Sequence, residues 1–340
     1  MSGSQYAAAG VSLATADAAR ARIAALVAGT RTPLSAGAIG AFGGMVRIPD
    51  GLRQPLLVMS TDGVGTKVLV AQEAGRLDTV GEDLVNHSVN DILVHGATPI
   101  AFQDYVAGNG LTVEAIAAIV EGVARGCRNH RMVLSGGETA QMPGLYQPGH
   151  FDLAGTILGV VEADQALHGD RIVPGDVLLG YASTGLHTNG FTLARRVLFE
   201  VMGLTLDQVV PQLGTSVGEA LLAVHRSYQA ALQPVLSVVH GLAHITGGGV
   251  PGNLVRVLPQ GSRAQVRTGA WPEPALFGLI RDGGKVSDEE MLDVFNLGIG
   301  MIALLPAEQV EPARQAAAAA AVETWVIGEV VPGATGVECH

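Results

Sequence analysis

The stretch Ser60-Thr61-Asp62-Gly63-Val64-Gly65-Thr66-Lys67 joins a short apolar run, residues 55–59, to a helical pattern that extends to residue 75. A carboxylate at the end of a strand can hold a hard cation, and glycines let backbone N–H groups approach an anion. A lysine at the start of the following helix adds positive charge for a phosphate. The spacing is not that of a GxxxxGK[ST] phosphate loop, so the alternative is a plain strand-to-helix turn with an exposed lysine.

Short apolar runs alternate with longer helical patterns on both sides of this stretch. An early helix is predicted over 16–27, and a glycine-rich segment follows from Gly37 to Gly44. Strands are predicted near 56–60, 100–105, 132–135, 153–161, 177–181 and 298–305, and helices near 67–75, 80–96, 113–126, 191–202 and 218–239. The pattern predicts an α/β or α+β protein of two domains, residues 1–168 and 169–340, divided in a polar, turn-rich segment.

Composition excludes several classes of protein. The 340 residues include 20 Lys and Arg against 31 Asp and Glu, and a net charge of −11 argues against a general nucleic-acid binder. No apolar run reaches the roughly 18 residues of a membrane span, and no basic residue precedes Arg20 as a secretory signal would require. We therefore expect a cytoplasmic protein.

Cys127 and Cys339 are far apart in sequence and are expected to be unpaired thiols.

Acidic residues recur where apolar runs end. Asp62, Asp104 and Glu138 each follow an apolar run at a strand end or glycine turn, and Asp91 lies among apolar residues of a predicted helix. Each alone is typical of a turn, but together they can converge on Mg²⁺, which prefers one or two carboxylates plus substrate phosphates. The pattern favours a nucleotide phosphate site. Glu82 and Asp83, in contrast, are expected on a solvated helix face.

Two further glycine loops lie in the second half, each before a predicted helix. They are residues 183–190, which include His187, and residues 244–249, which begin with His244. Such loops suit an anion or a polar small molecule. A lone histidine is more often structural, and these two attract attention because hydroxyls and glycines flank them. Phosphoryl transfer is the chemical class that fits these residues best.

Several motifs, taken together and in order, resemble the phosphoribosylformylglycinamidine cyclo-ligase family, whose members are also called aminoimidazole ribonucleotide synthetases. The resemblance covers nearly the whole chain and rests on Tyr6–Gly10, Thr61–Lys67, Val89–Asp91, Gly136–Ala140 with Met142–Gly144, Gly185–Gly190, His244–Gly249 and Phe295–Met301. It implies a homodimer in which the N-terminal domains build a β-barrel across the subunit interface, with a C-terminal α/β domain beside it. The small-molecule substrate implied is formylglycinamidine ribonucleotide, with ATP and Mg²⁺ as cofactors; a K⁺ requirement is left open. ATP would phosphorylate the formamide oxygen, and the amidine nitrogen would then close the imidazole ring in purine biosynthesis.

The resemblance also implies roles for individual residues. Mg²⁺ would be held by four acids: Asp62, Asp91, Asp104 and Glu138. The nucleotide would contact Gly63, Gly65, Thr66, Lys67, Asn90, Gly136 and Gly137, and the substrate would contact Thr188, Asn189, Thr246 and Gly247. Lys67, His187 and His244 would assist the chemistry. The Gly37–Gly44 segment would fold over ATP.

Two positions depart from the implied pattern or add to it. Ala24 stands where the family usually has a lysine, so another group would have to supply that charge. Cys339 is followed by His340 and is expected to be a tail thiol without a role. A second class of function is a module that binds nucleotide only to regulate or assemble a partner, and turnover of ATP would distinguish the two.

Overall fold

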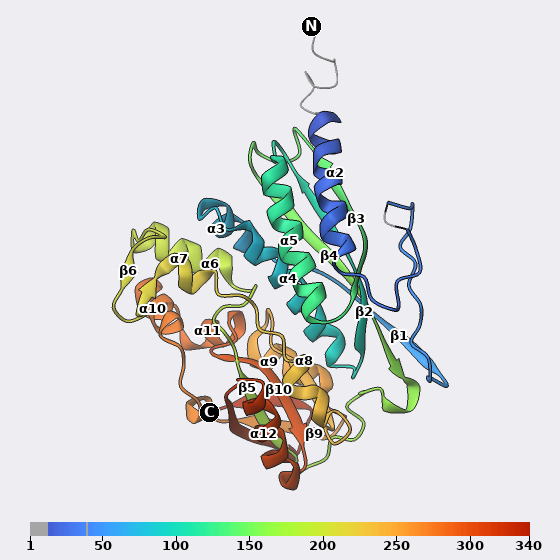
Figure 1. Cartoon of the computed structure of the whole chain (residues 1–340). Helices are drawn as coiled ribbons and strands as arrows, with labels where there is room; N and C mark the ends of the chain where they lie inside the picture. Colours follow the sequence, from blue (N-terminus) through green and yellow to red (C-terminus); the bar gives the residue numbers. More distant parts are fainter. Residues whose placement is uncertain (1–12, 39) are drawn as a thin grey trace, which may run out of the picture. The chain divides into compact units, whose positions relative to one another are not determined.

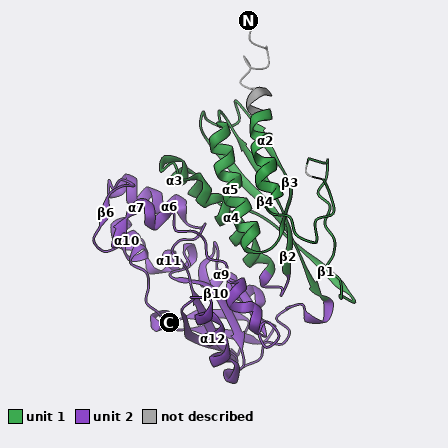
Figure 2. Cartoon of the chain, in the orientation of Figure 1, with its two compact units in different colours: residues 1–92, 98–162 green, residues 93–97, 163–340 purple. Residues whose placement is uncertain are grey.

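Two large sheets, each with its own helices, organise the described part of the chain (Figure 1). The computed structural model describes residues 13–38 and 40–340. It divides into unit 1, which runs to residue 92 and includes 98–162, and unit 2, which consists of 93–97 and 163–340 (Figure 2). The predicted division between residues 168 and 169 lies a few residues beyond the end of unit 1.

Unit 1 contains a four-stranded sheet in the order β1-β4-β2-β3. Only the β2–β3 pair is parallel; β1 and β2 both run antiparallel to β4. Its described elements are α2 (Leu13–Ala28), β1 (Pro55–Gly63), α3 (Lys67–Glu73), α4 (Leu77–Leu93), β2 (Thr98–Gly108), α5 (Val113–Asn129), β3 (Val133–Gln141) and β4 (Phe151–Glu162).

Helices α4 and α5 pack closely on one another and on one face of this sheet (Figure 1). A Cβ on Gly81 of α4 would lie 2.1 Å from the Ile119 carbonyl oxygen of α5, so only glycine allows this approach. Leu84 of α4 contacts β4 at Gly155, which fixes the buried face of the sheet. The other face leaves Leu57 and Met59 of β1 52% and 66% exposed.

Unit 2 contains a six-stranded sheet in the order β12-β9-β11-β5-β10-β8, in which only β12 and β9 pair in parallel. Its strands are β5 (Val177–Ala182), β8 (Gly241–His244), β9 (Ser262–Val266), β10 (Ile299–Leu305), β11 (Thr324–Pro332) and β12 (Gly336–Cys339), with a small hairpin of β6 (Val209–Val210) and β7 (Thr215–Ser216). The α-helices are α6 (Phe191–Arg195), α7 (Val217–Leu221), α8 (Gln229–Leu232), α9 (Gly249–Leu254), α10 (Ala275–Gly284), α11 (Asp288–Val294) and α12 (Val310–Ala319).

The two expected helices of unit 2 are broken. The first continues from α6 as a π-helical turn, Arg196–Val201, and the second is reduced to α7 and α8 with irregular chain between them. The prediction of one helix over 218–239 was wrong because side chains of the intervening segment bind elsewhere: the Tyr228 hydroxyl donates to the Ala182 carbonyl at 3.0 Å. The broken segment carries His225.

The expected mixture of α and β structure in two parts is confirmed. Among the residues described, no helix is long and apolar enough to cross a membrane. Both cysteines are free thiols, with Cys127 buried in α5.

Candidate active site

The carboxyl end of β1 brings two of the predicted acids together. Asp62 Oδ2 lies 2.9 Å from His87 Nε2 of α4, and the same nitrogen is 3.5 Å from Asp91 Oδ2, one helical turn along. The Ser60 hydroxyl donates to Asp91 at 3.1 Å. Ser60 and Asp62 both face α4 because they are two residues apart on a strand. The helical spacing of His87 and Asp91 completes the cluster.

Burial and charge act in opposite directions on this cluster. Burial alone would raise the pKa of Asp62, but the hydrogen bond and positive charge of His87, with the Gly63 N–H, hold it below its usual value. Burial alone would lower the pKa of His87, yet the bond to Asp62 and the nearby acids raise it. The arrangement therefore favours a charged imidazole between two ionised carboxylates.

The donor set at the end of β1 suits a hard cation. The side chains of Asp62 and Asp91 remain 45% and 22% exposed, so their oxygens are accessible. Two carboxylates beside a hydroxyl match the preference of Mg²⁺ for a few protein oxygens together with phosphate. The residues present fit this metal.

Lys67 lies elsewhere than the sequence suggested. Its Nζ is 2.8 Å from Asp83 Oδ2, and both side chains are fully buried. Burial lowers the pKa of Lys67, although Asp83 opposes that shift. The expectation that Asp83 lies on a solvated face was wrong, and Lys67 is not the exposed lysine of a plain turn. Glu82 instead pairs with Arg125 of α5 at 2.7 Å.

The turn between β1 and α3 retains the predicted backbone features. Gly65 adopts a positive φ of 55°, and Thr66 is the N-cap residue of α3. Asn90 is fully buried within α4. The Gly63 N–H donates to its neighbour Asp62 at 2.8 Å.

The other two predicted metal ligands are not part of this cluster. Asp62 and Asp104 both pair in register with Gly155, so they face the same side of the sheet with β4 between them. That separates their backbones by roughly two strand spacings, about 10 Å. Glu138 pairs with Tyr105, the neighbour of Asp104, and so faces the opposite side. Burial raises the pKa of Asp104 to about 7.

A cavity of about 1130 Å³ in unit 1 is bounded by strand residues of the sheet together with α2 and Ile116 of α5. Strand residues Thr61, Gln103 and Glu138 line it, together with Gly136, Gly137 and Asp104. The glycine-rich segment from Gly37 borders it, with Ile39 outside the described residues. Ala24 lines it as well, and the basic residues in its described lining are Arg20 and Arg31. Thr61 faces the cavity and the next residue, Asp62, faces His87, so the end of β1 borders both regions.

The two glycine loops of unit 2 lie close together. Gly190 and Gly248 are left-handed N-cap residues of α6 and α9. A Cβ on Gly247 would lie 3.7 Å from Asn189 Nδ2. Among the residues described, Asn189 Oδ1 is buried and accepts no hydrogen bond. Buried polar groups ordinarily have partners, so this oxygen is suited to a ligand.

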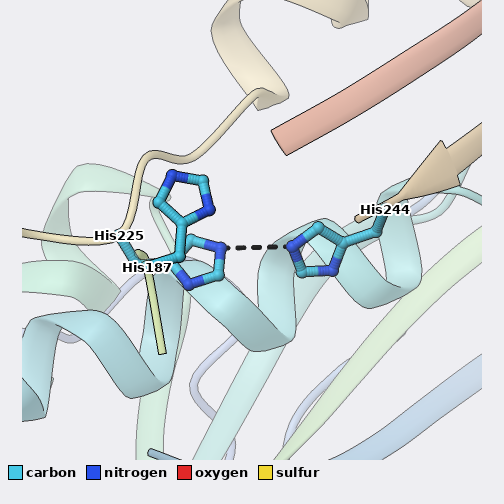
Figure 3. Close-up of side chains that lie close together, drawn as sticks. All are labelled: His187, His225 and His244. Carbon is cyan, nitrogen blue, oxygen red and sulfur yellow. Dashed lines mark hydrogen bonds between the residues drawn. The ribbon is translucent and has the colours of Figure 1, made fainter. Parts of the chain in front are cut away.

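The histidines of these loops form one cluster with a third that sequence reasoning did not select (Figure 3). His187 has a φ of 60°, unusual for a residue with a Cβ, and its Nε2 accepts from the Thr184 N–H at 3.2 Å. Thr188 is buried beside it. His225 lies 3.1 Å from His244 between their Nε2 atoms. No local pattern singles out His225, because it reaches the two loops only through the irregular chain between α7 and α8.

Asn253 is a second residue that the sequence analysis missed. It is 3% exposed, and its amide donates to the carbonyls of Thr246, Gly247 and Gly249 at 3.3, 3.2 and 2.8 Å. It therefore holds the loop in shape from inside α9. An asparagine within the first turns of a short helix is the only local signal, since such residues often bond to nearby backbone.

Comparison with known proteins gives the chain its class. Residues 43–161 match the N-terminal domain of AIR synthase related proteins, and residues 173–339 match their C-terminal domain. The chain is 47% identical to a phosphoribosylformylglycinamidine cyclo-ligase of Sorangium cellulosum, covering 96% of this chain and 95% of the relative. It is also 47% identical to one of Symbiobacterium thermophilum, covering 93% and 91%.

The chain is thus a two-domain AIR synthase related protein. It belongs to the phosphoribosylformylglycinamidine cyclo-ligase family, and the resemblance found in its motifs is confirmed. The enzyme class and the ATP-dependent reaction expected from that resemblance are confirmed with it.

Solved structures share the fold at low identity. A thiamine-monophosphate kinase from Stenotrophomonas maltophilia matches with a TM-score of 0.69 at 18% identity, covering 97% of this chain and 96% of the other. The hydrogenase maturation protein HypE in complex with ATP matches at 0.60 and 20% identity, covering 92% and 89%.

Proposed function

We propose that this chain uses ATP to close the imidazole ring of aminoimidazole ribonucleotide, and that the end of β1 is where the ATP phosphates and Mg²⁺ bind. The observation that carries the proposal is the Asp62–His87–Asp91 cluster directly before the glycine turn, with atom separations of 2.9 and 3.5 Å. Asp62 and Asp91 hold the metal. When bound, Mg²⁺ neutralises charge on the transferring phosphate.

The nucleotide occupies the cavity beside this cluster. Gly136 and Gly137 line it without side chains, and Thr61 connects it to Asp62. Arg20 or Arg31 supplies the positive charge that Ala24 lacks. The segment from Gly37 to Gly44 covers the bound nucleotide. Asp104 and Glu138 line the cavity and contact the nucleotide. Lys67 holds the turn between β1 and α3 in place through its ion pair with Asp83.

The ribonucleotide substrate binds the two loops of unit 2. Asn189 Oδ1, buried and without a partner among the described residues, accepts from the substrate, and Thr188, Thr246 and Gly247 complete the contacts. The γ-phosphoryl group of ATP moves to the formamide oxygen and ADP leaves. The amidine nitrogen then attacks the formamide carbon, the C–O bond breaks to release phosphate, and the nitrogen loses a proton. His244 takes up that proton, and His187 assists from the neighbouring loop.

We also propose that the active protein is a homodimer. β1 is an edge strand of its sheet, and Leu57, Met59 and Tyr105 expose apolar surface on the face that the helices leave open. Exposed apolar sheet faces and free strand edges mark surfaces that other chains cover. A second copy packed on this face continues the sheet into a barrel.

A cytoplasmic location stays a prediction.

The test of the metal assignment is Asp62→Asn, with Asp50→Asn as the matched control because Asp50 is exposed in a turn. We expect the first variant to lose ADP formation by about 100-fold or more while its circular dichroism spectrum and sedimentation stay unchanged. The control should retain activity. Full turnover by folded Asp62→Asn would overturn the assignment.

A further inference from the structure

A hydrogen-bonded chain runs through the interior of unit 2 and is centred on His225. This residue is fully buried. Its Nδ1 lies 3.3 Å from the Thr188 hydroxyl oxygen, and its Nε2 lies 3.1 Å from His244 Nε2. Figure 3 shows the contact between the two rings, with His187 close to His225.

The ring of His225 is held in place from two sides. His187 stacks on it with the ring centres 3.9 Å apart and the planes 21° from parallel. The Thr184 hydroxyl donates to the Val224 carbonyl at 2.6 Å, which ties the backbone next to His225 to the same loop. Thr184 also donates its N–H to His187. The loop before α6 thus fixes both the plane and the position of His225.

We infer that His225 is a positioning residue, which determines the nitrogen of His244 that carries the ring proton and couples that choice to the hydroxyl of Thr188. This inference rests on the proposed function, in which His244 takes up a proton and Thr188 meets the substrate. Nothing in the family comparisons or in the motifs assigned a role to His225.

The coupling follows from the chemistry of imidazole. A neutral ring has one N–H donor and one acceptor nitrogen. When the Thr188 hydroxyl donates to His225 Nδ1, His225 carries its proton on Nε2 and donates to His244 Nε2, so His244 carries its own proton on Nδ1. When Thr188 accepts instead, His225 Nε2 becomes the acceptor and His244 must carry its proton on Nε2. Binding that engages Thr188 therefore selects the tautomer of His244.

The same three histidines offer the donor set of a zinc site, with ligand nitrogens within 4.8 Å of one another. The ring geometry argues for the hydrogen-bonded chain. Stacked imidazoles direct their in-plane lone pairs alongside one another rather than toward one point, and His187 Nε2 already accepts from Thr184. Metal binding is accordingly an outcome that the test must be able to detect.

The kinetic test compares three variants. His225→Leu keeps much of the volume and removes both polar atoms, whereas His225→Gln places an amide near the position of Nε2. We expect His225→Leu to lower kcat by about 100-fold with KM for the ribonucleotide changed by less than about threefold, and His225→Gln to recover most of the loss. His168→Leu, at an exposed histidine of unit 2, is the control and should keep full activity.

A second readout does not depend on turnover. In protein labelled with ¹⁵N-histidine, the ring nitrogens of His244, assigned by their loss in His244→Gln, should report one neutral tautomer in the wild type. That pattern should change in His225→Leu and persist in His168→Leu. Failure of the wild type to form aminoimidazole ribonucleotide would refute the proposed function, while the nitrogen spectra would still judge the coupling.

Three results would overturn the inference. The first is a folded His225→Leu enzyme with unchanged kcat, and the second is an unchanged His244 tautomer in that variant. The third is stoichiometric binding of Zn²⁺ by the wild type that disappears in His225→Leu, which would make the cluster a metal site.

Discussion

Lys67 Nζ lies 2.8 Å from Asp83 Oδ2, and neither side chain has measurable exposure. The pair connects the first residue of α3 to α4, immediately after the glycine turn that follows Asp62. An ammonium and a carboxylate buried together are costly unless they stay paired. The pair therefore fixes the backbone of the turn, and we assign Lys67 a structural effect on the phosphate site rather than direct contact.

Breaking this pair should destabilise the protein more than removing it entirely. Asp83→Asn removes the charge that Asp83 supplies to the buried ammonium, and we expect a loss of about 3–5 kcal/mol in the free energy of unfolding. Lys67→Met combined with Asp83→Leu should cost less than Asp83→Asn alone. Urea denaturation provides the measurement, with Asp50→Asn as a control expected to change stability by less than about 0.5 kcal/mol. A loss below about 1 kcal/mol in Asp83→Asn would show that the pair is not buried as described.

Asp104 should make the unliganded protein less stable as the pH rises. Burial raises its pKa to about 7 in the folded state, from an ordinary value of 3.8. The folded state therefore binds the proton more tightly than the unfolded state, so the cost of ionising Asp104 is absent below about pH 4 and complete above about pH 7. Asp104→Asn removes this cost.

The variant should gain stability relative to the wild type between pH 4 and pH 8, by up to about 4 kcal/mol. Urea titrations at several pH values, without Mg²⁺ or nucleotide, measure the difference. A stability difference between the two proteins that is independent of pH would contradict the burial of an ionisable Asp104.

The open face of the unit 1 sheet should be the dimer interface. Leu57→Lys with Met59→Lys adds two charges to that face, where both side chains are largely exposed in the single chain. We expect sedimentation to show a monomer, because buried unpaired charges oppose association. Val201→Lys, at an equally exposed apolar residue of unit 2, is the control and should stay dimeric. A dimer that survives the double substitution would place the interface elsewhere.

The sequence predicted features that local pattern determines. The strand before Asp62, the glycine turn, and the N-terminal glycines of α6 and α9 all follow from periodicity and backbone freedom. The motif order was sufficient to identify the family. Residues 6–10, which contributed to that resemblance, lie outside the described residues.

Features that depend on contacts between distant segments could not be predicted. Asp83 was expected on a solvated helix face beside Glu82, and only tertiary packing buries it against Lys67. His225 joins His244 because a helix expected to be continuous is broken. Gly300 lies in a strand with no turn to require it, yet a Cβ there would lie 2.1 Å from the Tyr228 hydroxyl and 2.5 Å from His187 Cε1. The reason for that glycine is spatial.

Strand register also decided which acids could act together. Asp62 and Asp104 share a face but are separated by β4, and Glu138 faces the other side. The three acids at strand ends looked equivalent in sequence, because alternation across neighbouring strands cannot be assigned before the pairing is known.

ATP-dependent ring closure is measured by following ADP and aminoimidazole ribonucleotide in the same reaction. Purified protein is given Mg²⁺ and ATP, with and without formylglycinamidine ribonucleotide. We expect ADP release that depends on the ribonucleotide and matches the imidazole product mole for mole. ADP release that ignores the ribonucleotide, or binding of ATP by folded dimer without turnover, would contradict it and favour a relative with another substrate or a module that only binds nucleotide.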